Sequence, residues 1–286
     1  MSTDGLIVAV EQFAAATIHC DDADLERAWV WRSYEEGIRF AFFRTYEELR
    51  ELAARLSYLR TQLASPVSTA QHALGQYHAA YRDLQAVLLG LSLDQMSLAP
   101  APGEWAIKQI LPHMFRTSGS FFANIVFALE RGRAMEKTPV RLTDDDWDKV
   151  WAGDPFEQVI ENADFLGLLS YYEQFHKRIL NELEGITQEE LSILSMWWED
   201  EPYPLEFRLH RLDSHLRQHT VQVEKTLNVL GIFPNEAKRL LRLVYNALAE
   251  VESVHIGARD FGADECGQLA SGISARAVEI GQLIHP

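Results

Sequence analysis

Two histidines four residues apart, His215 and His219, are the residues whose type and spacing most directly suggest chemistry. On a helix, residues at positions i and i+4 lie on one face with their Cβ atoms about 5–6 Å apart. Two imidazoles in that arrangement can reach one metal ion, at about 2.0–2.1 Å if the ion is zinc. A third candidate, His113, lies near the start of another helical segment, EWAIKQILPHM. If the three side chains converge, the chain holds a metal site inside a helical bundle.

The apolar pattern around these histidines indicates which way they face. His219 fills a gap in an apolar stripe, three residues after Leu216 and four before Val223, so it should point into the core. His215 should border that core. An unpartnered buried imidazole costs about 1–3 kcal/mol. A metal ion, a carboxylate or a backbone carbonyl would each satisfy it, and the spacing alone does not choose among them. His113 stands on a line with Ala106, Ile110, Thr117 and Phe121.

Helical periodicity dominates the rest of the chain, and no segment shows convincing strand alternation. The pattern predicts an all-α fold, and we expect helices over about 38–63, 74–91, 104–132, 156–183, 205–230, 235–257 and 262–284. The acidic connection 138–154 should be a surface loop with a short helical turn, and Thr187 and Glu190 have capping-box spacing.

We predict three parts: an N-terminal helical extension over 1–64, a four-helix bundle over 70–233, and a C-terminal helical hairpin over 234–286. The two flanking parts should pack on the bundle or form the contact of a homodimer.

Composition excludes several classes of protein. The net charge is −16, from 42 acidic and 26 basic residues, and such a surface repels nucleic-acid phosphates. No apolar run reaches the roughly 18 residues that a membrane helix needs, and the N-terminus lacks the basic start of a secretory signal. Cys20 and Cys266 stand outside any CxxC pattern, which is typical of reduced thiols in a cytoplasmic protein, and a disulfide between them is the alternative. We expect a cytoplasmic protein without nucleic-acid or membrane partners.

Two motifs in order resemble the DinB/YfiT-like superfamily of metal-binding four-helix bundle proteins. In that family a tryptophan begins the second bundle helix and a histidine follows eight residues later, as do Trp105 and His113 in PGEWAIKQILPH. The last bundle helix carries His-x3-His, often followed by x2-Gln, and this chain has His215, His219 and Gln222 in HLRQHTVQ. The resemblance covers about 70–233. It implies that His113, His215 and His219 hold one divalent ion (zinc, nickel or iron), with water or a thiolate as fourth ligand.

Other residues can be placed around this site. Gln222 would either orient a ligand imidazole or be solvated. We expect Trp105 to plug the start of its helix rather than to stack on substrate. His176 is the best additional pocket candidate. Trp197 and Trp198 would either line a pocket mouth or pack.

The resemblance identifies the residues of the site better than it identifies the reaction. Family members include thiol-dependent S-transferases and isomerases, proposed hydrolases and many proteins of unknown activity. We expect a metal-dependent enzyme that transfers a low-molecular-weight thiol onto a small-molecule substrate. Metal-dependent hydrolysis is the alternative, and a non-catalytic metal-binding or stress-related helical protein is the second alternative. No P-loop, GxGxxG, GxSxG or HExxH motif occurs, and no side chain is assigned as the catalytic residue.

Overall fold

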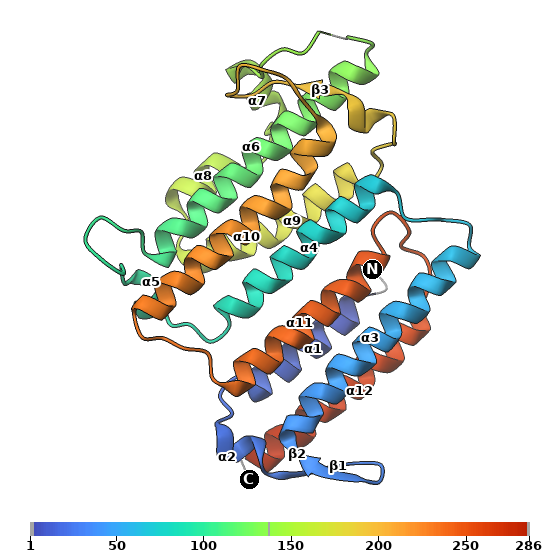
Figure 1. The fold of residues 1–286 in the computed structure, drawn as a ribbon, viewed down its shortest axis with the longest axis vertical. Coiled ribbons are helices and arrows are strands. Elements are labelled where there is room, and N and C mark those ends of the chain that lie inside the picture. The colour runs from blue at the N-terminus through green and yellow to red at the C-terminus, as the bar shows by residue number, and fades with distance from the viewer. Residues whose placement is uncertain (1–2, 137, 285–286) are drawn as a thin grey trace. The chain divides into compact units, whose positions relative to one another are not determined.

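The fold is seen in a computed structural model that describes residues 3–136 and 138–284. These residues form twelve α-helices, one short 3-10 turn and two small antiparallel hairpins (Figure 1). The prediction of an all-α fold with extra helices on both flanks is confirmed. The hairpins, with strands of four and two residues, were not expected from the sequence.

The elements follow one another along the chain as α1 (Asp4–Thr17), α2 (Asp22–Leu25), β1 (Ala28–Trp31), β2 (Tyr34–Gly37), α3 (Ile38–Gln62), α4 (Thr69–Leu88), α5 (Leu93–Ser97), α6 (Ile107–Arg133), α7 (Asp144–Val150), α8 (Phe156–Asn162), α9 (Phe165–Leu183), η1 (Glu190–Ser192), β3 (Leu194–Ser195), β4 (Tyr203–Pro204), α10 (Leu205–Val229), α11 (Glu236–Val254) and α12 (Ala263–Ile284).

Contacts between residues divide the chain into two compact units. Unit 1 contains 1–67, 78–91 and 231–286, and unit 2 contains 68–77 and 92–230. Helix α4 therefore contributes its first turns to unit 2 and its later turns to unit 1.

Unit 1 is built around four long helices with a core of their own. Helix α1 packs along α12, and α3 packs along α11. Phe13 and Phe42 meet edge to face in this core, with ring centroids 5.1 Å apart. Both cysteines, Cys20 and Cys266, are buried free thiols among these apolar side chains. The segments at the two ends of the sequence thus share one hydrophobic core.

A buried charged network fixes α4 to α11 within unit 1. The carboxylate of Glu252 accepts two hydrogen bonds from the guanidinium of Arg82, at 2.7 and 2.6 Å. The Nε2 atom of His78 lies 3.0 Å from the same carboxylate. A buried carboxylate is tolerated only when it is paired in this way, because unpaired burial of a charge is costly.

Unit 2 holds the site region, built mainly from α6, α9 and α10 with the first turns of α4. The phenol ring of Tyr172 on α9 stacks on Phe115 of α6, with centroids 3.7 Å apart. Its hydroxyl lies 3.3 Å from the hydroxyl of Tyr77 on α4. Helix α10 packs on α6 and stops before Gly231, whose φ of 72° is the left-handed conformation that favours glycine at a helix end.

The prediction of one continuous helix over 156–183 is wrong. Helix α8 ends at Asn162 and α9 begins at Phe165, because Ala163 and Asp164 are extended and the Asp164 side chain accepts a bond from the Gly167 N–H. This cap starts a new helix. Leu166, in the first turn of this new helix, is 66% exposed.

Local capping signals in the sequence are otherwise reproduced. Thr143 and Asp146 form a capping box that starts α7 inside the acidic connection. Thr187 and Glu190 exchange the same pair of bonds at the 3-10 turn. Asn235 caps α11 by accepting from the Lys238 N–H.

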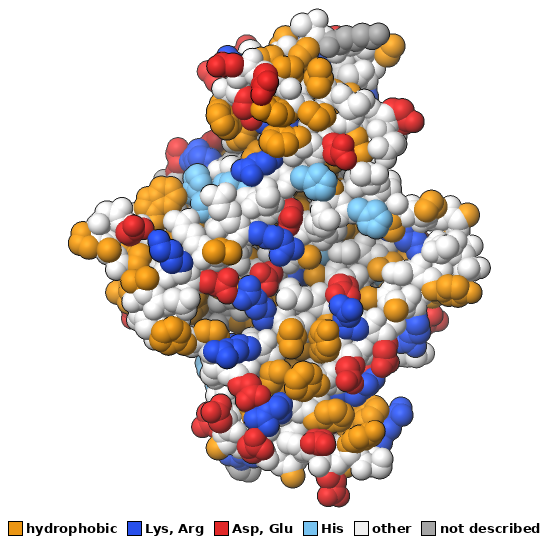
Figure 2. All heavy atoms as spheres, viewed as in Figure 1, with side chains coloured by type: hydrophobic (Ala, Val, Ile, Leu, Met, Phe, Trp, Pro, Cys, Tyr) orange, Lys and Arg blue, Asp and Glu red, His pale blue; other side chains and the backbone are white. Residues whose placement is uncertain are grey.

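The surface is of mixed charge, and acidic and basic side chains are interspersed over the face drawn in Figure 2. Within the described residues, none of the helices is both long enough and apolar enough to cross a bilayer.

Candidate metal centre

Helices α6 and α10 bring the three predicted histidines together. His113 comes from the first turns of α6, and His215 and His219 come from the middle of α10, on the side that packs against α6. One nitrogen from each ring can be chosen so that all three lie within 4.8 Å of one another. The ring centroid of His113 is 4.8 Å from that of His219 and 5.5 Å from that of His215.

The side chain of Gln222 fixes the orientation of one ring. Its Oε1 atom lies 2.7 Å from Nδ1 of His219. An amide oxygen can only accept, so the proton of this imidazole is on Nδ1 and the lone pair is on Nε2. That Nε2 atom faces Nε2 of His215 at 3.1 Å. Gln222 therefore occupies the orienting position that partners of metal-bound imidazoles take.

The surroundings of His113 and His215 favour the neutral forms of these two imidazoles. Burial, followed by the charges of His219, His113 and Arg211, lowers the pKa of His215 to about 3. Burial and the charge of His219 also lower the pKa of His113. Neutral imidazoles are the form that binds metal. The donor set therefore fits a divalent ion of the zinc, nickel or iron type.

The three histidines differ in their access to solvent. His215 and His219 are 7% and 6% exposed, whereas His113 is only half-buried. Trp105 precedes α6, is 42% exposed, and lies with its ring 5.2 Å from that of His113. The cluster is thus enclosed on the α10 side and more open on the side of His113 and Trp105.

An aromatic wall continues from His215 toward the β3–β4 hairpin. The ring of Phe121, two turns after His113 on α6, lies 5.9 Å from His215. Trp197 in the hairpin contacts Phe121 edge to face at 5.0 Å, while its neighbour Trp198 is 73% exposed. Of the two predicted tryptophans, Trp197 reaches this wall and Trp198 faces solvent.

Buried Arg208 holds the hairpin in place. Its guanidinium donates to both carboxylate oxygens of Glu199, at 2.6 and 2.9 Å, and to Ser195 Oγ at 3.0 Å. These bonds hold Ser195 and Glu199, which lie two residues before and two residues after Trp197. The sequence analysis did not identify this role, since a polar run such as WEDEPYP does not reveal its partner.

His176 lies outside the cluster. Its side chain is 2% exposed and packs on Tyr77, with ring centroids 4.8 Å apart, in the core between α4 and α9. Among the described residues, the group able to hold a metal ion consists of His113, His215 and His219.

Sequence reasoning missed Arg211. It stands one turn before His215 on the same face of α10, and its guanidinium lies 5.7 Å from the ring centroid of Phe121. The signal available in the sequence was the i, i+4, i+8 spacing of Arg211, His215 and His219.

A small cavity adjoins the centre. It has a volume of about 170 Å³ and shares Gln222 with the histidine cluster. One acidic side chain, Glu104, and one basic side chain, Lys225, line it. The other lining residues are Pro100, Ala101, Gln222, Thr226 and Val229.

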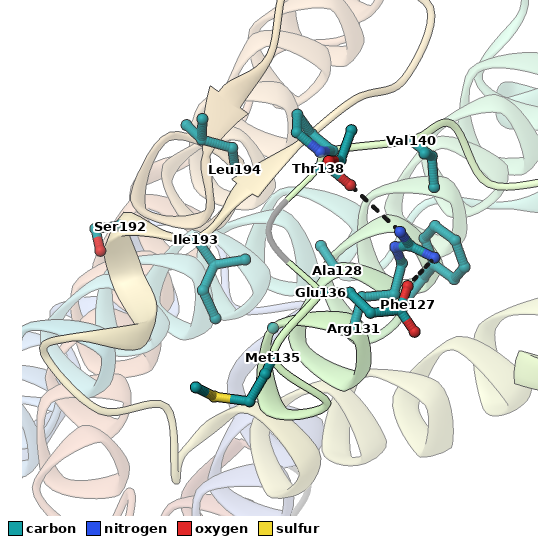
Figure 3. Close-up of a pocket in the computed structure, with 12 residues that line it drawn as sticks. Phe127, Ala128, Arg131, Met135, Glu136, Thr138, Val140, Ser192, Ile193 and Leu194 are labelled. Atoms are coloured by element: carbon teal, nitrogen blue, oxygen red, sulfur yellow. Dashed lines mark hydrogen bonds and ion pairs between the residues drawn. The ribbon is translucent and has the colours of Figure 1, made fainter.

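A larger cavity of about 370 Å³ lies at the other end of α6 (Figure 3). Phe127 and Arg131 of α6, with Ile193 beside β3, are among its lining residues. Phe127 is fourteen residues beyond His113, which corresponds to about 21 Å along a helix. This cavity is therefore separate from the histidine cluster.

Comparison with known proteins supports the family suggested by the motifs. A sequence profile described as the DinB superfamily matches residues 76–223, just over half of the chain, and this range includes the three histidines and Gln222. No curated protein and no solved structure matches the chain with significance. The chain belongs to the DinB superfamily, and it carries a histidine triad that could bind a metal ion.

Proposed function

We propose that this protein is a divalent-metal-dependent enzyme that transfers a small thiol onto an electrophilic substrate. The observation that carries the proposal is the convergence of His113, His215 and His219 within 4.8 Å, with no carboxylate in the cluster among the described residues. Bound by neutral imidazoles alone, a divalent ion would retain its full charge and would lower the pKa of a thiol or of water.

Three features of the chain would orient the metal ligands and admit the reactants. Gln222 keeps the proton of His219 on Nδ1, so that Nε2 remains a donor toward the ion. His113 is the ligand on the more open side, where a reactant can approach. The small cavity that Gln222 lines offers a place for the polar tail of the thiol. There Lys225 could pair with a negatively charged group of the thiol, and Glu104 could pair with a positively charged one.

Metal-dependent hydrolysis is the second candidate. Hydrolysis needs only the ion, a water molecule and an accessible carbonyl, so the same three histidines would suffice. The cavity beside Gln222 favours thiol transfer, because hydrolysis requires no pocket for a second organic reactant. A non-catalytic metal site is disfavoured by the half-buried position of His113, since structural sites are closed by four protein ligands.

Metal analysis tests the first step. Protein purified without a histidine tag should contain about one divalent ion per chain, and His215→Ala should lose it. His210→Ala is the matched control, because His210 is exposed on the same helix and should leave the metal content unchanged. Equal metal content in wild type and His215→Ala would reject the proposed site.

The visible spectrum of cobalt-substituted protein tests the reaction. Adding 2-mercaptoethanol or cysteine should introduce a thiolate-to-cobalt absorption if a thiol enters the coordination sphere. A spectrum that no small thiol changes would eliminate thiol transfer. If such a protein nevertheless cleaves model esters, hydrolysis becomes the function of the site.

A further inference from the structure

Among the residues that the structure describes, the guanidinium of Arg211 has no carboxylate partner, although the protein is strongly acidic. Unit 2 contains three other arginines that are buried or half-buried, and each forms an ion pair: Arg131 with Glu136, Arg178 with Asp154, and Arg208 with Glu199. Arg211 is half-buried as well. Among the described residues, its polar contact is a hydrogen bond to the hydroxyl of Ser214 at 3.1 Å. A guanidinium that no carboxylate neutralises is a candidate for binding an anionic ligand.

The position of this charge relates it to the histidine cluster. Arg211 is one turn from His215 on α10, and its guanidinium lies above Phe121, whose ring also contacts His215. The charge of Arg211 is among the causes that lower the pKa of His215, after burial and the two other histidines. An anion bound to Arg211 would therefore lie within one helical turn of the proposed metal.

The larger cavity offers a contrast. Its arginine, Arg131, is paired with Glu136 at 2.6 Å and donates to the backbone oxygen of Thr138, as the dashed lines in Figure 3 show. That positive charge is already neutralised within the protein. An anionic ligand needs a positive charge that no carboxylate neutralises, and of these two arginines Arg211 offers it and Arg131 does not.

We propose that Arg211 binds a carboxylate of the electrophilic substrate, beside the histidine cluster. A planar guanidinium pairs with a carboxylate through two parallel N–H···O bonds. The net charge of −16 disfavours the approach of any anion, so an acidic substrate needs a local positive group of this kind. This inference rests on the proposed function and adds the class of substrate.

Benzoate is a suitable probe, because it carries one carboxylate and has an uncharged analogue of the same shape. Its binding to wild type should be measured by ligand-observed NMR on the metal-free protein and by the visible spectrum of the cobalt form. Arg211→Gln should weaken benzoate binding by about 10- to 100-fold in both forms. Arg211→Lys should recover part of the loss. Benzamide, which has the same shape without the charge, should bind weakly and equally to wild type and Arg211→Gln.

The control variant is Arg217→Gln. It removes the same charge from α10, but Arg217 is exposed and paired with Asp213. Benzoate binding should be unchanged in this variant. Equal affinity of wild type and Arg211→Gln for benzoate, or equal losses in the two variants, would overturn the proposal. The measurement on metal-free protein keeps this test separate from the proposed function. Even if the protein binds no cobalt, benzoate binding in wild type and Arg211→Gln still shows whether Arg211 holds a carboxylate.

Discussion

Nδ1 of His219 lies 2.7 Å from the amide oxygen of Gln222, while Nε2 of the same ring faces His215 at 3.1 Å. One imidazole thus has its proton held on one side and its lone pair presented to a second histidine on the other. This arrangement is the one that the proposed metal site would need. It also makes the contribution of Gln222 measurable.

Replacing Gln222 should weaken metal binding without abolishing it. Gln222→Ala removes the acceptor that fixes the tautomer and orientation of His219, and the loss of such partners typically lowers metal affinity about 10–100-fold. Competition with a chelator of known affinity measures the change. Gln218→Ala, on the exposed face of the same helix, should have no effect. Equal affinities of the two variants would contradict the orienting role of Gln222.

Removal of the metal should lower thermal stability in a way that depends on the histidines. A ligand that binds only the folded state at about 100 times its Kd contributes about 2.7 kcal/mol. EDTA should therefore lower the Tm of the metal-loaded wild type in differential scanning calorimetry. His215→Ala should melt at a temperature that EDTA does not change. An identical response of the two proteins to EDTA would indicate that the ion binds elsewhere.

Acid should destabilise the protein through Glu252. Burial alone would raise the pKa of this carboxyl, but Arg82 and His78 lower it well below the ordinary value of 4.5. As the pH falls below about 4.5, the unfolded chain binds a proton that the folded protein does not, so the free energy of unfolding decreases. The slope from this group is at most about 1.4 kcal/mol per pH unit.

The measurement is urea denaturation between pH 7 and pH 3. Glu252→Gln should be less stable than wild type at pH 7, because Arg82 loses its charged partner. It should also have a shallower dependence on pH. Glu250→Gln, at an exposed position paired with Arg50, should retain the slope of wild type. If Glu252→Gln retained the full slope, other carboxylates would account for the acid sensitivity.

A methyl group at position 119 should destabilise unit 2. Gly119 of α6 lies under the ring of Phe156, and a Cβ atom there would overlap the ring atoms. Overpacking of this kind costs about 1–3 kcal/mol, and chemical denaturation of Gly119→Ala measures it. Gly185→Ala is the control, since a Cβ atom at that position meets no atom within 4 Å. Stability of Gly119→Ala equal to wild type would show that Phe156 moves aside freely.

Local patterns explain which features could be predicted. The gap in the apolar stripe at His219 depends only on residues within two turns, and it correctly placed that side chain in the core. Capping pairs such as Thr187 and Glu190 are equally local. The break at Ala163 and Asp164 was missed because the apolar spacing continues across it, while the Asp164 side chain accepts a bond from the Gly167 N–H and starts a new helix.

The sequence by itself determined the helical class, the family motifs and the pairing of His215 with His219 on one face, because these follow from spacings of three, four and eight residues. Only the tertiary structure decided that His113 approaches the pair, since this depends on how α6 packs on α10. Packing likewise placed Trp197 on Phe121 and His176 on Tyr77, and within the described part of the chain it gave Arg211 a hydroxyl rather than a carboxylate as its partner. Such contacts join residues far apart in the chain, and short-range periodicity carries no information about which of them will meet.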